Sequence, residues 1–155
     1  MTFASVFLVS LSTLFFEVLI NRAFAITQWS HLAFMVIGIA MFGLSAGSMW
    51  VHVRMFKQTQ VRKRHLTGPA IAAGASIIIS WICVNLIPFN TIELPFSRIQ
   101  IVYLALVFLF LSLPFFFAGV VSATGFATES GKPGGVYAAS MTGSAAGALL
   151  PVVLL

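Results

Sequence analysis

Charged residues divide the chain into long uncharged windows. Residues 23–53, 65–92, 99–128 and 133–155 contain no Asp, Glu, Lys or Arg. A helix that crosses a hydrocarbon core of roughly 30 Å needs about 20 apolar residues, each rising 1.5 Å, so each window is long enough for one such helix. A further apolar run begins at Phe3 and reaches that length only if Glu17 and Arg22 lie within the membrane. The pattern predicts an all-α bundle of five transmembrane helices, at about 3–25, 31–53, 70–89, 100–123 and 136–155.

Helix-breaking residues lie between these predicted helices. Gly68 and Pro69 precede the third helix, where proline is tolerated in the first turn. Pro88 and Pro95 flank the next connection, and residues 128–135 combine Glu, Lys, Pro and glycines in a turn signal. The breakers therefore support the same five segments.

Composition indicates which solvent surrounds these helices. Apolar residues make up 60% of the 155 residues and charged residues only 7%, whereas a soluble domain has about 25% charged residues. So few ionic groups cannot cover a water-facing surface, which excludes an ordinary soluble globule. The sequence predicts an integral membrane protein whose main partner is the lipid bilayer.

The positive charge is concentrated in one connection. The net charge is +5, and five of the eight basic residues follow the second predicted helix: Arg54, Lys57, Arg62, Lys63 and Arg64. Cytoplasmic loops carry such an excess of Lys and Arg, so we expect the 54–66 loop and the N-terminus to be cytoplasmic, in a bacterial inner membrane. A nucleic-acid patch is the less favoured interpretation, and we expect no nucleic-acid partner.

The last predicted helix ends without a polar flank, at Pro151-Val152-Val153-Leu154-Leu155. Membrane helices normally finish with interfacial or charged residues. We therefore expect a single transmembrane domain over 1–155 that is a fragment or a subunit of a larger protein. The alternative is a genuine C-terminal carboxylate at the outer interface.

Glu17 is the most informative polar residue. A carboxylate within a membrane span is costly and usually faces a bundle interior or a cavity, with a partner. Asn21 is four residues further on the same helical face and could hydrogen-bond it, whereas Arg22 points elsewhere and is long enough to reach the interface. Glu17 is thus either a polar clamp between helices or part of an ion or substrate site.

Small residues recur at helical spacing in the second and fifth predicted helices. They are Ala40, Gly43 and Gly47 in the second, and Ala139, Gly143 and Gly147 in the fifth. Such ridges allow two helix backbones to approach closely, so helix packing is the favoured interpretation. A glycine-lined pathway is the alternative.

Other candidate chemistry is sparse. His31, His52 and His65 are too widely spaced for an i, i+3 or i, i+4 metal pair, so we expect neither a metal nor a cofactor. His31 follows Trp29 and is expected to hydrogen-bond near the outer interface. The chain contains no Asp, which excludes a Ser-His-Asp triad.

Two stretches together resemble the N-terminal membrane region of the membrane-bound spermidine synthase-like proteins. The first comprises Glu17-Val18-Leu19-Ile20-Asn21-Arg22, Trp29-Ser30-His31-Leu32-Ala33-Phe34-Met35 and Gly43-Leu44-Ser45-Ala46-Gly47-Ser48. The second comprises Leu113-Pro114-Phe115-Phe116-Phe117-Ala118-Gly119 and residues 136–149, which begin Val136-Tyr137-Ala138-Ala139-Ser140. The resemblance implies a multi-helix, partly transporter-like membrane domain, joined in that family to a Rossmann-type aminopropyltransferase-like domain. It adds Tyr137 and Ser140 to the candidate polar site of Glu17, Asn21, Arg22 and His31.

The chain departs from that family in two respects. Ser140 stands where the family usually has Asp or Asn, which weakens a polar contact between helices. The soluble catalytic domain is absent from these 155 residues, so we expect no aminopropyl transfer by this chain alone.

Two functions remain open from the sequence. The preferred one is an anchoring and packing module for other membrane subunits or for the remainder of a longer chain. The alternative is a transporter-like module that moves a small cation or a polyamine, with Glu17 as the coupling residue.

Overall fold

The computed structural model describes residues 2–27, 30–55, 66–88, 98–129 and 131–154. These residues form five α-helices: α1 (Thr2–Thr27), α2 (Ser30–Met55), α3 (Thr67–Leu86), α4 (Arg98–Thr128) and α5 (Pro133–Leu154). All five are long and apolar enough to cross a membrane. The predicted all-α bundle of five membrane helices is confirmed, and the chain is a multi-pass integral membrane protein.

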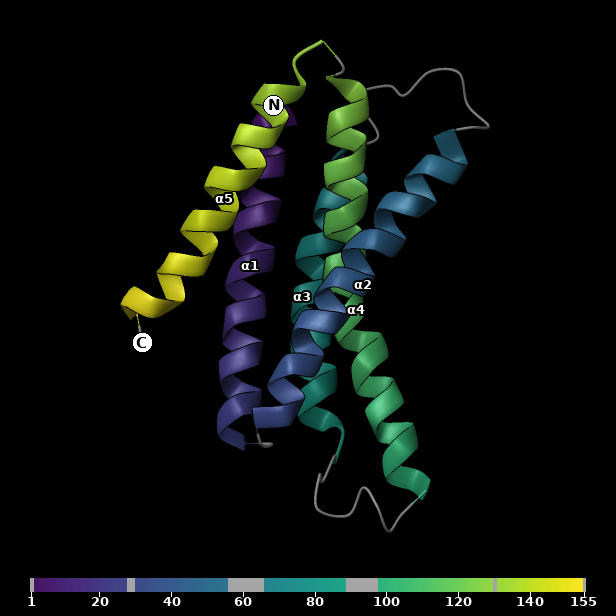
Figure 1. Ribbon diagram of the computed structural model, residues 1–155. Coiled ribbons are helices and arrows are strands. Elements are labelled where there is room, and N and C mark those ends of the chain that lie inside the picture. Colours follow the sequence, from purple (N-terminus) through teal and green to yellow (C-terminus); the bar gives the residue numbers. More distant parts are fainter. Residues whose placement is uncertain (1, 28–29, 56–65, 89–97, 130, 155) are drawn as a thin grey trace.

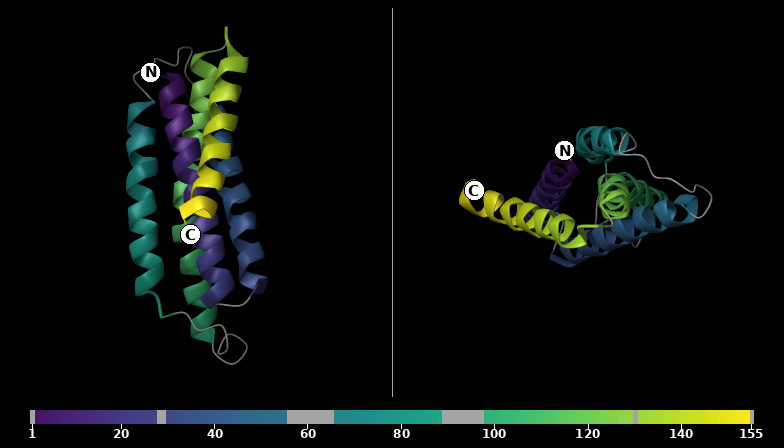
Figure 2. Two further views of the ribbon diagram at one scale, coloured as in Figure 1. Left: turned by 90° about the vertical axis from the view of Figure 1, so that its left-hand side faces the viewer. Right: turned by 90° about the horizontal axis from the view of Figure 1, so that it is seen from above.

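The helices alternate in direction along the bundle (Figure 1). α1, α3 and α5 run away from the end that holds the N-terminus, and α2 and α4 run back towards it. The most extensive contacts join α1 with α5 and α2 with α4, so each major pair is parallel and unites helices that are distant in sequence. α3 packs mainly on α4, behind the other helices in Figure 1, as the side view in Figure 2 shows.

Helix boundaries differ modestly from the predicted ones. α3 lies three residues earlier than the predicted 70–89 at both ends, because Pro69 fits within its first turn. Ile87, which precedes Pro88, is extended with φ −78° and ψ 118°, as steric contact with a following proline favours. α4 continues to Thr128, five residues beyond the predicted end, where Thr124 and Thr128 donate hydrogen bonds to carbonyl groups four residues earlier.

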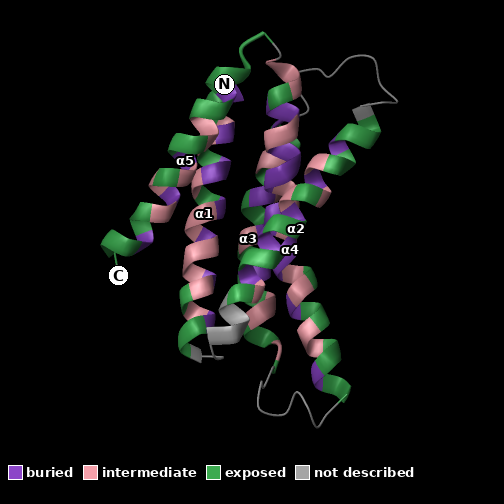
Figure 3. Ribbon diagram, in the orientation of Figure 1, coloured by how far each residue is buried: buried purple, intermediate pink, exposed green. Residues whose placement is uncertain are grey.

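Burial is greatest in α4, above all in its second half (Figure 3). One cluster of buried residues joins α1, α2 and α4 through Phe16, Ile20, Ile39, Leu111 and Phe115. A second cluster lies closer to the N-terminal end of the bundle and includes Val6, Ala73, Val121 and Val136. α4 is therefore the central helix, while the other four expose long apolar faces.

Candidate functional site

The α2–α4 interface is built on glycines of α2. A methyl group added at Gly43 would lie 2.6 Å from the Phe115 Cβ and 2.8 Å from the Ser112 carbonyl oxygen. One added at Gly47 would collide with the Phe116 carbonyl oxygen. Both glycines are buried against α4, so a larger residue at either position would force the two backbones apart. Ala40, one turn before Gly43, is also buried, with 2% of its surface exposed.

The close approach in this pair is reciprocal. Gly119 of α4 faces the Leu44 carbonyl oxygen of α2 so closely that an added methyl group would collide with it. The Ser48 hydroxyl donates to the Leu44 carbonyl oxygen at 2.9 Å and lies 3.4 Å from the Gly119 carbonyl oxygen. Backbone atoms of both helices therefore form the contact surface, as in close-packed membrane helix pairs.

The α1–α5 interface has glycines on one helix only. Gly143 and Gly147 of α5 pack against the carbonyl oxygens of Phe7 and Leu11, respectively, and a methyl group at either glycine would collide with those oxygens. Ala139, one turn earlier in α5, is half-buried. α1 contributes no glycine to this contact. The close approach of the two backbones therefore depends on the glycines of α5.

A hydroxyl pair crosses the same interface. The Ser10 and Ser140 Oγ atoms lie 3.1 Å apart and form a hydrogen bond. Ser140 therefore makes an interhelical polar contact despite replacing the Asp or Asn expected from the family resemblance. Tyr137, one turn before Ser140, is 56% exposed.

Glu17 lies roughly 4 Å beyond the midpoint of α1, at 1.5 Å per residue. It is half-buried, between the core residues Phe16 and Ile20 along the chain. The structure contains no hydrogen bond between Glu17 and Asn21, although their spacing places them on one face. Among the described residues, no hydrogen bond or ion pair of the Glu17 carboxylate is found, and Arg22 is exposed. The structure therefore does not bring these three polar residues together as a closed site.

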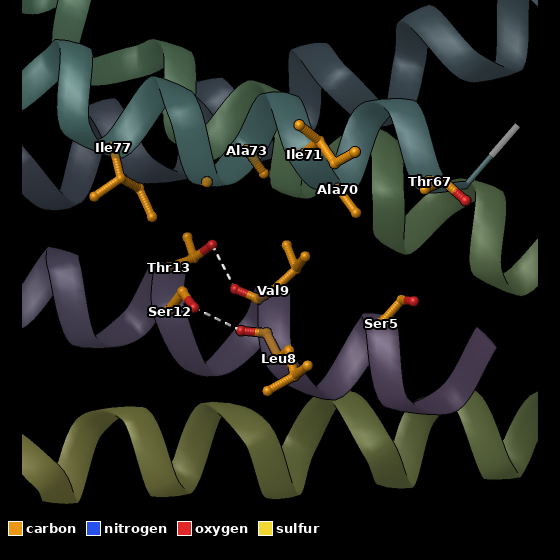
Figure 4. A pocket seen from close by; sticks show the side chains of 11 residues that line it. Ser5, Leu8, Val9, Ser12, Thr13, Thr67, Ala70, Ile71, Ala73 and Ile77 are labelled. Carbon is orange, nitrogen blue, oxygen red and sulfur yellow. Dashed lines mark hydrogen bonds between the residues drawn. The ribbon is translucent and has the colours of Figure 1, made fainter. Parts of the chain in front are cut away.

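Two clefts open along α1, and Glu17 lines neither. The first, of about 300 Å³, lies between α1 and α3 (Figure 4). The hydroxyl groups of Ser12 and Thr13 in its wall donate to carbonyl oxygens of α1 itself, at 2.8 Å and 2.7 Å. The second cleft, of about 750 Å³, lies open between α1, α3 and α5 and is lined by Leu11, Ser12, Phe15, Phe16, Leu19, Gly74, Ile77, Ile78, Trp81, Leu150 and Leu154. Among the described residues, neither lining contains a charged side chain.

Polar contacts also mark the N-terminal end of the bundle. The Thr2 hydroxyl donates to the Glu129 carboxylate at 3.2 Å and thereby joins α1 to the end of α4. Arg54, at the end of α2, stacks over the Trp50 ring with 4.1 Å between the guanidinium carbon and the ring centroid. Lys57, Arg62, Lys63, Arg64 and the side chain of His31 lie outside the described residues. Within the described part, no three His, Cys, Asp or Glu residues gather as a metal site.

Comparison with protein families, with curated proteins and with solved structures finds no match to this chain. These comparisons identify no family, and the resemblance to the spermidine synthase-like proteins stays a prediction. What the structure establishes is a five-helix membrane bundle held by two glycine-based interfaces.

Sequence reasoning did not single out Ser10, Ser48 or Gly119. Ser10 lies two helical turns before Glu17 and therefore on the same face of the helix, but Ser5, Ser12 and Thr13 make it one of several hydroxyl residues in that segment. Gly119 has a small residue, Ala123, four positions after it but Phe115 four positions before it, so the sequence gives only a short small-residue ridge. Its role depends on the facing backbone of α2, which the sequence does not display.

Proposed function

We propose that the chain is a membrane-embedded packing module that anchors other membrane helices of a larger assembly. The observation that carries this proposal is the second cleft, which is wide, apolar and open between α1, α3 and α5. Small residues in its wall, Ser12 and Gly74, are of the kind that membrane helices use where another helix approaches closely. The uncharged lining suits an apolar helix better than a hydrophilic solute.

The lipid-facing side of α5 offers further support. Ala138 and Ala145 are exposed there, although long aliphatic side chains would cover more of a lipid boundary. α3 likewise exposes Gly74 and Ala75. Small exposed residues at membrane depth favour contact with other helices.

Purification in a mild detergent tests this function. We expect the full chain, extracted from its native membrane, to migrate in a complex with defined membrane polypeptides that re-form when purified components are mixed. Recovery of a stable, monodisperse monomer without partners, under conditions that preserve its helicity, would contradict the proposal.

A second candidate function rests on Glu17 alone. Its carboxylate lies near the middle of a span without a partner among the described residues, and such groups often belong to ion or substrate pathways. Under this alternative the module moves a small cation or a polyamine, and Glu17 couples the movement.

Uptake of labelled spermidine into proteoliposomes tests the alternative. Glu17→Gln should reduce uptake at least tenfold, and Glu129→Gln, which alters a carboxylate at the end of α4, should leave uptake within twofold of wild type. Equal uptake by wild type and Glu17→Gln would eliminate transport through Glu17.

The packing role also implies an orientation and an absence of catalysis. Arg54 and Lys132 both lie at the end of the bundle that holds the N-terminus, and this charge distribution supports our proposal that this end is cytoplasmic, in a bacterial inner membrane. No aminopropyl transfer is expected from this chain by itself, because that chemistry would belong to a separate soluble domain.

A further inference from the structure

The second and fifth helices share a local pattern at a spacing of 100 residues. Met41, Gly43, Ala46 and Gly47 correspond in type to Met141, Gly143, Ala146 and Gly147. The sequence of buried, half-buried and exposed positions is identical over 41–52 and 141–152. Val36 and Val136, one turn before these stretches, are both fully buried. α5 therefore repeats α2 in both residue type and environment.

The first and fourth helices correspond through what they contact. Gly43 and Gly47 pack against Ser112 and Phe116 of α4, whereas Gly143 and Gly147 pack against Phe7 and Leu11 of α1. Residue 7 of α1 thus corresponds to residue 112 of α4, and residue 11 to residue 116. With that alignment, every buried residue within 2–20 corresponds to a buried residue within 107–125.

The arrangement in space agrees with these two correspondences. Turning Figure 1 by half a turn in the plane of the page exchanges α1 with α4, and exchanges α5 with α2. Because α1 and α4 are antiparallel, the two units have opposite orientations in the membrane, as in proteins built from inverted repeats. The units are α1–α2–α3 and α4–α5, so α3 has no counterpart among the described residues.

The environment of α1 differs from that of α4 along one stripe. Leu8 and Ser12 are exposed, and Phe15 and Leu19 are half-buried. Their counterparts in α4 are all less exposed: Leu113 and Phe117 are half-buried, and Val120 and Thr124 are buried. α3 packs on α4 but touches α1 only slightly. The uncovered stripe is therefore where a counterpart of α3 would reduce the exposure of α1.

The clefts follow this stripe. They share Ser12, Gly74 and Ile77, and together they extend from Ser5 to Leu19 along α1. Fourteen residues at 1.5 Å each give a groove of about 21 Å, or roughly two-thirds of the hydrocarbon thickness. The groove is continuous with the α1–α5 and α1–α3 contacts, and its length suits a transmembrane helix.

We propose that this groove, formed by α1, α3 and α5, seats one further membrane helix that is the counterpart of α3 and runs in the opposite direction to it. This inference rests on the proposed packing function and specifies its surface. The occupant has the chemistry of α3: an uncharged span with small residues on the face towards the bundle, where α3 itself buries Ala73, Ser76 and Ser80.

A synthetic peptide of residues 66–88 is the probe, because it carries the sequence of α3. Its binding to the purified chain in bicelles is measured by Förster resonance energy transfer between fluorophores on the peptide and on the chain. We expect saturable binding that Gly74→Leu weakens at least tenfold. A Cβ added at Gly74 meets no other atom of the described chain within 4 Å, and Gly74 lines both clefts, so we expect this variant to obstruct the groove. Gly38→Leu is the matched control, since Gly38 is equally open but lies on α2, and it should change binding less than twofold.

Disulfide formation reports where the peptide lies and in which direction. The peptide retains Cys83, and the chain carries Cys83→Ser with one new cysteine. A peptide antiparallel to α3 brings its Cys83 to the depth of Ser5, whereas a peptide parallel to α3 brings it to the depth of Leu19. We expect cross-linking to Ser5→Cys to exceed that to Leu19→Cys, and to exceed that to Ala138→Cys on the opposite face of α5, by at least tenfold.

Several outcomes would overturn the proposal. They are equal binding by a scrambled peptide, equal effects of Gly74→Leu and Gly38→Leu, preferential cross-linking to Leu19→Cys, or self-association of the chain that Gly74→Leu abolishes. Saturable binding at the Ala138 face would refute this groove while leaving the packing function intact. Absence of any saturable binding, together with a partner-free monomer from native membranes, would refute both.

Discussion

The α2–α4 and α1–α5 pairs solve the same packing problem with different chemistry. Both are parallel and both use two glycines at four-residue spacing. In the α2–α4 pair, Gly119 of α4 lies at the contact together with the glycines of α2, so both helices lack a side chain where their backbones meet. In the α1–α5 pair only α5 does so, and the Ser10–Ser140 hydrogen bond adds a polar contact.

This difference follows the positions of the helices in the bundle. α4 is central and half of its membrane window is buried, so its interface with α2 is confined from several sides. α5 packs mainly on α1 and exposes most of its surface. A confined interface depends on shape, whereas a peripheral one gains more from a directional hydrogen bond.

The largest expected loss of stability comes from a steric collision between the two backbones of a helix pair. Gly47→Leu should lower the free energy of unfolding by more than about 3 kcal/mol, because the facing Phe116 carbonyl belongs to a backbone that cannot move aside. Gly147→Leu should cost less, because α5 is peripheral and can tilt away from α1. SDS titration monitored by circular dichroism measures both, and Gly38→Leu serves as the unaffected control. Equal losses from Gly47→Leu and Gly147→Leu would contradict the assigned difference.

A smaller loss of stability is expected when a single methyl group is added to a glycine of α4. Gly119→Ala should cost about 1–3 kcal/mol, because its Cβ would collide with the Leu44 carbonyl oxygen of the neighbouring backbone. Gly125→Ala should cost less, since the added Cβ would lie 2.8 Å from a methyl group of the Val6 side chain, a longer contact than the one with the Leu44 carbonyl oxygen and one that involves no backbone atom of another helix. The same SDS titration tests the order, and a larger loss for Gly125→Ala would show that side-chain packing dominates around α4.

The smallest expected effect isolates the polar contact. A double-mutant cycle with Ser10→Ala and Ser140→Ala should give a coupling free energy of about 0.6 kcal/mol, as is typical of hydrogen bonds between membrane helices. Ser48→Ala should have a weaker effect on the α2–α4 pair, since the shorter bond of Ser48 is to its own helix. A coupling indistinguishable from zero would assign the α1–α5 contact to the glycines alone.

The positions of most helices could be predicted because charges and helix breakers lie between them. Residues 99–128 contain no ionic group, and α4 covers this whole window. The error at α3 arose where Pro69 was compatible with both the start of a helix and its first turn. Boundaries in such segments depend on one or two backbone angles rather than on hydropathy.

The partners of each helix could not be predicted in the same way. In water an apolar stripe identifies the buried face of a helix, but in lipid both faces are apolar and the stripe disappears. Gly43 and Gly143 were recognisable as packing residues, yet nothing in the local sequence indicated α4 for one and α1 for the other. Glu17 and Asn21 show a different limit of sequence-based prediction. Their spacing predicted a shared helical face correctly, but it did not determine whether the two side chains form a hydrogen bond.

The pairing of α1 with α5 has a consequence for biogenesis. About one hundred residues separate the end of α1 from the start of α5, so at bacterial or eukaryotic rates of translation, roughly 5–20 residues per second, α1 waits about 5–20 s for that neighbour. During this interval Ser10 and Glu17 must reside in the bilayer, at the insertion machinery or against a chaperone. The α1–α5 pair can therefore form only after α5 has left the ribosome.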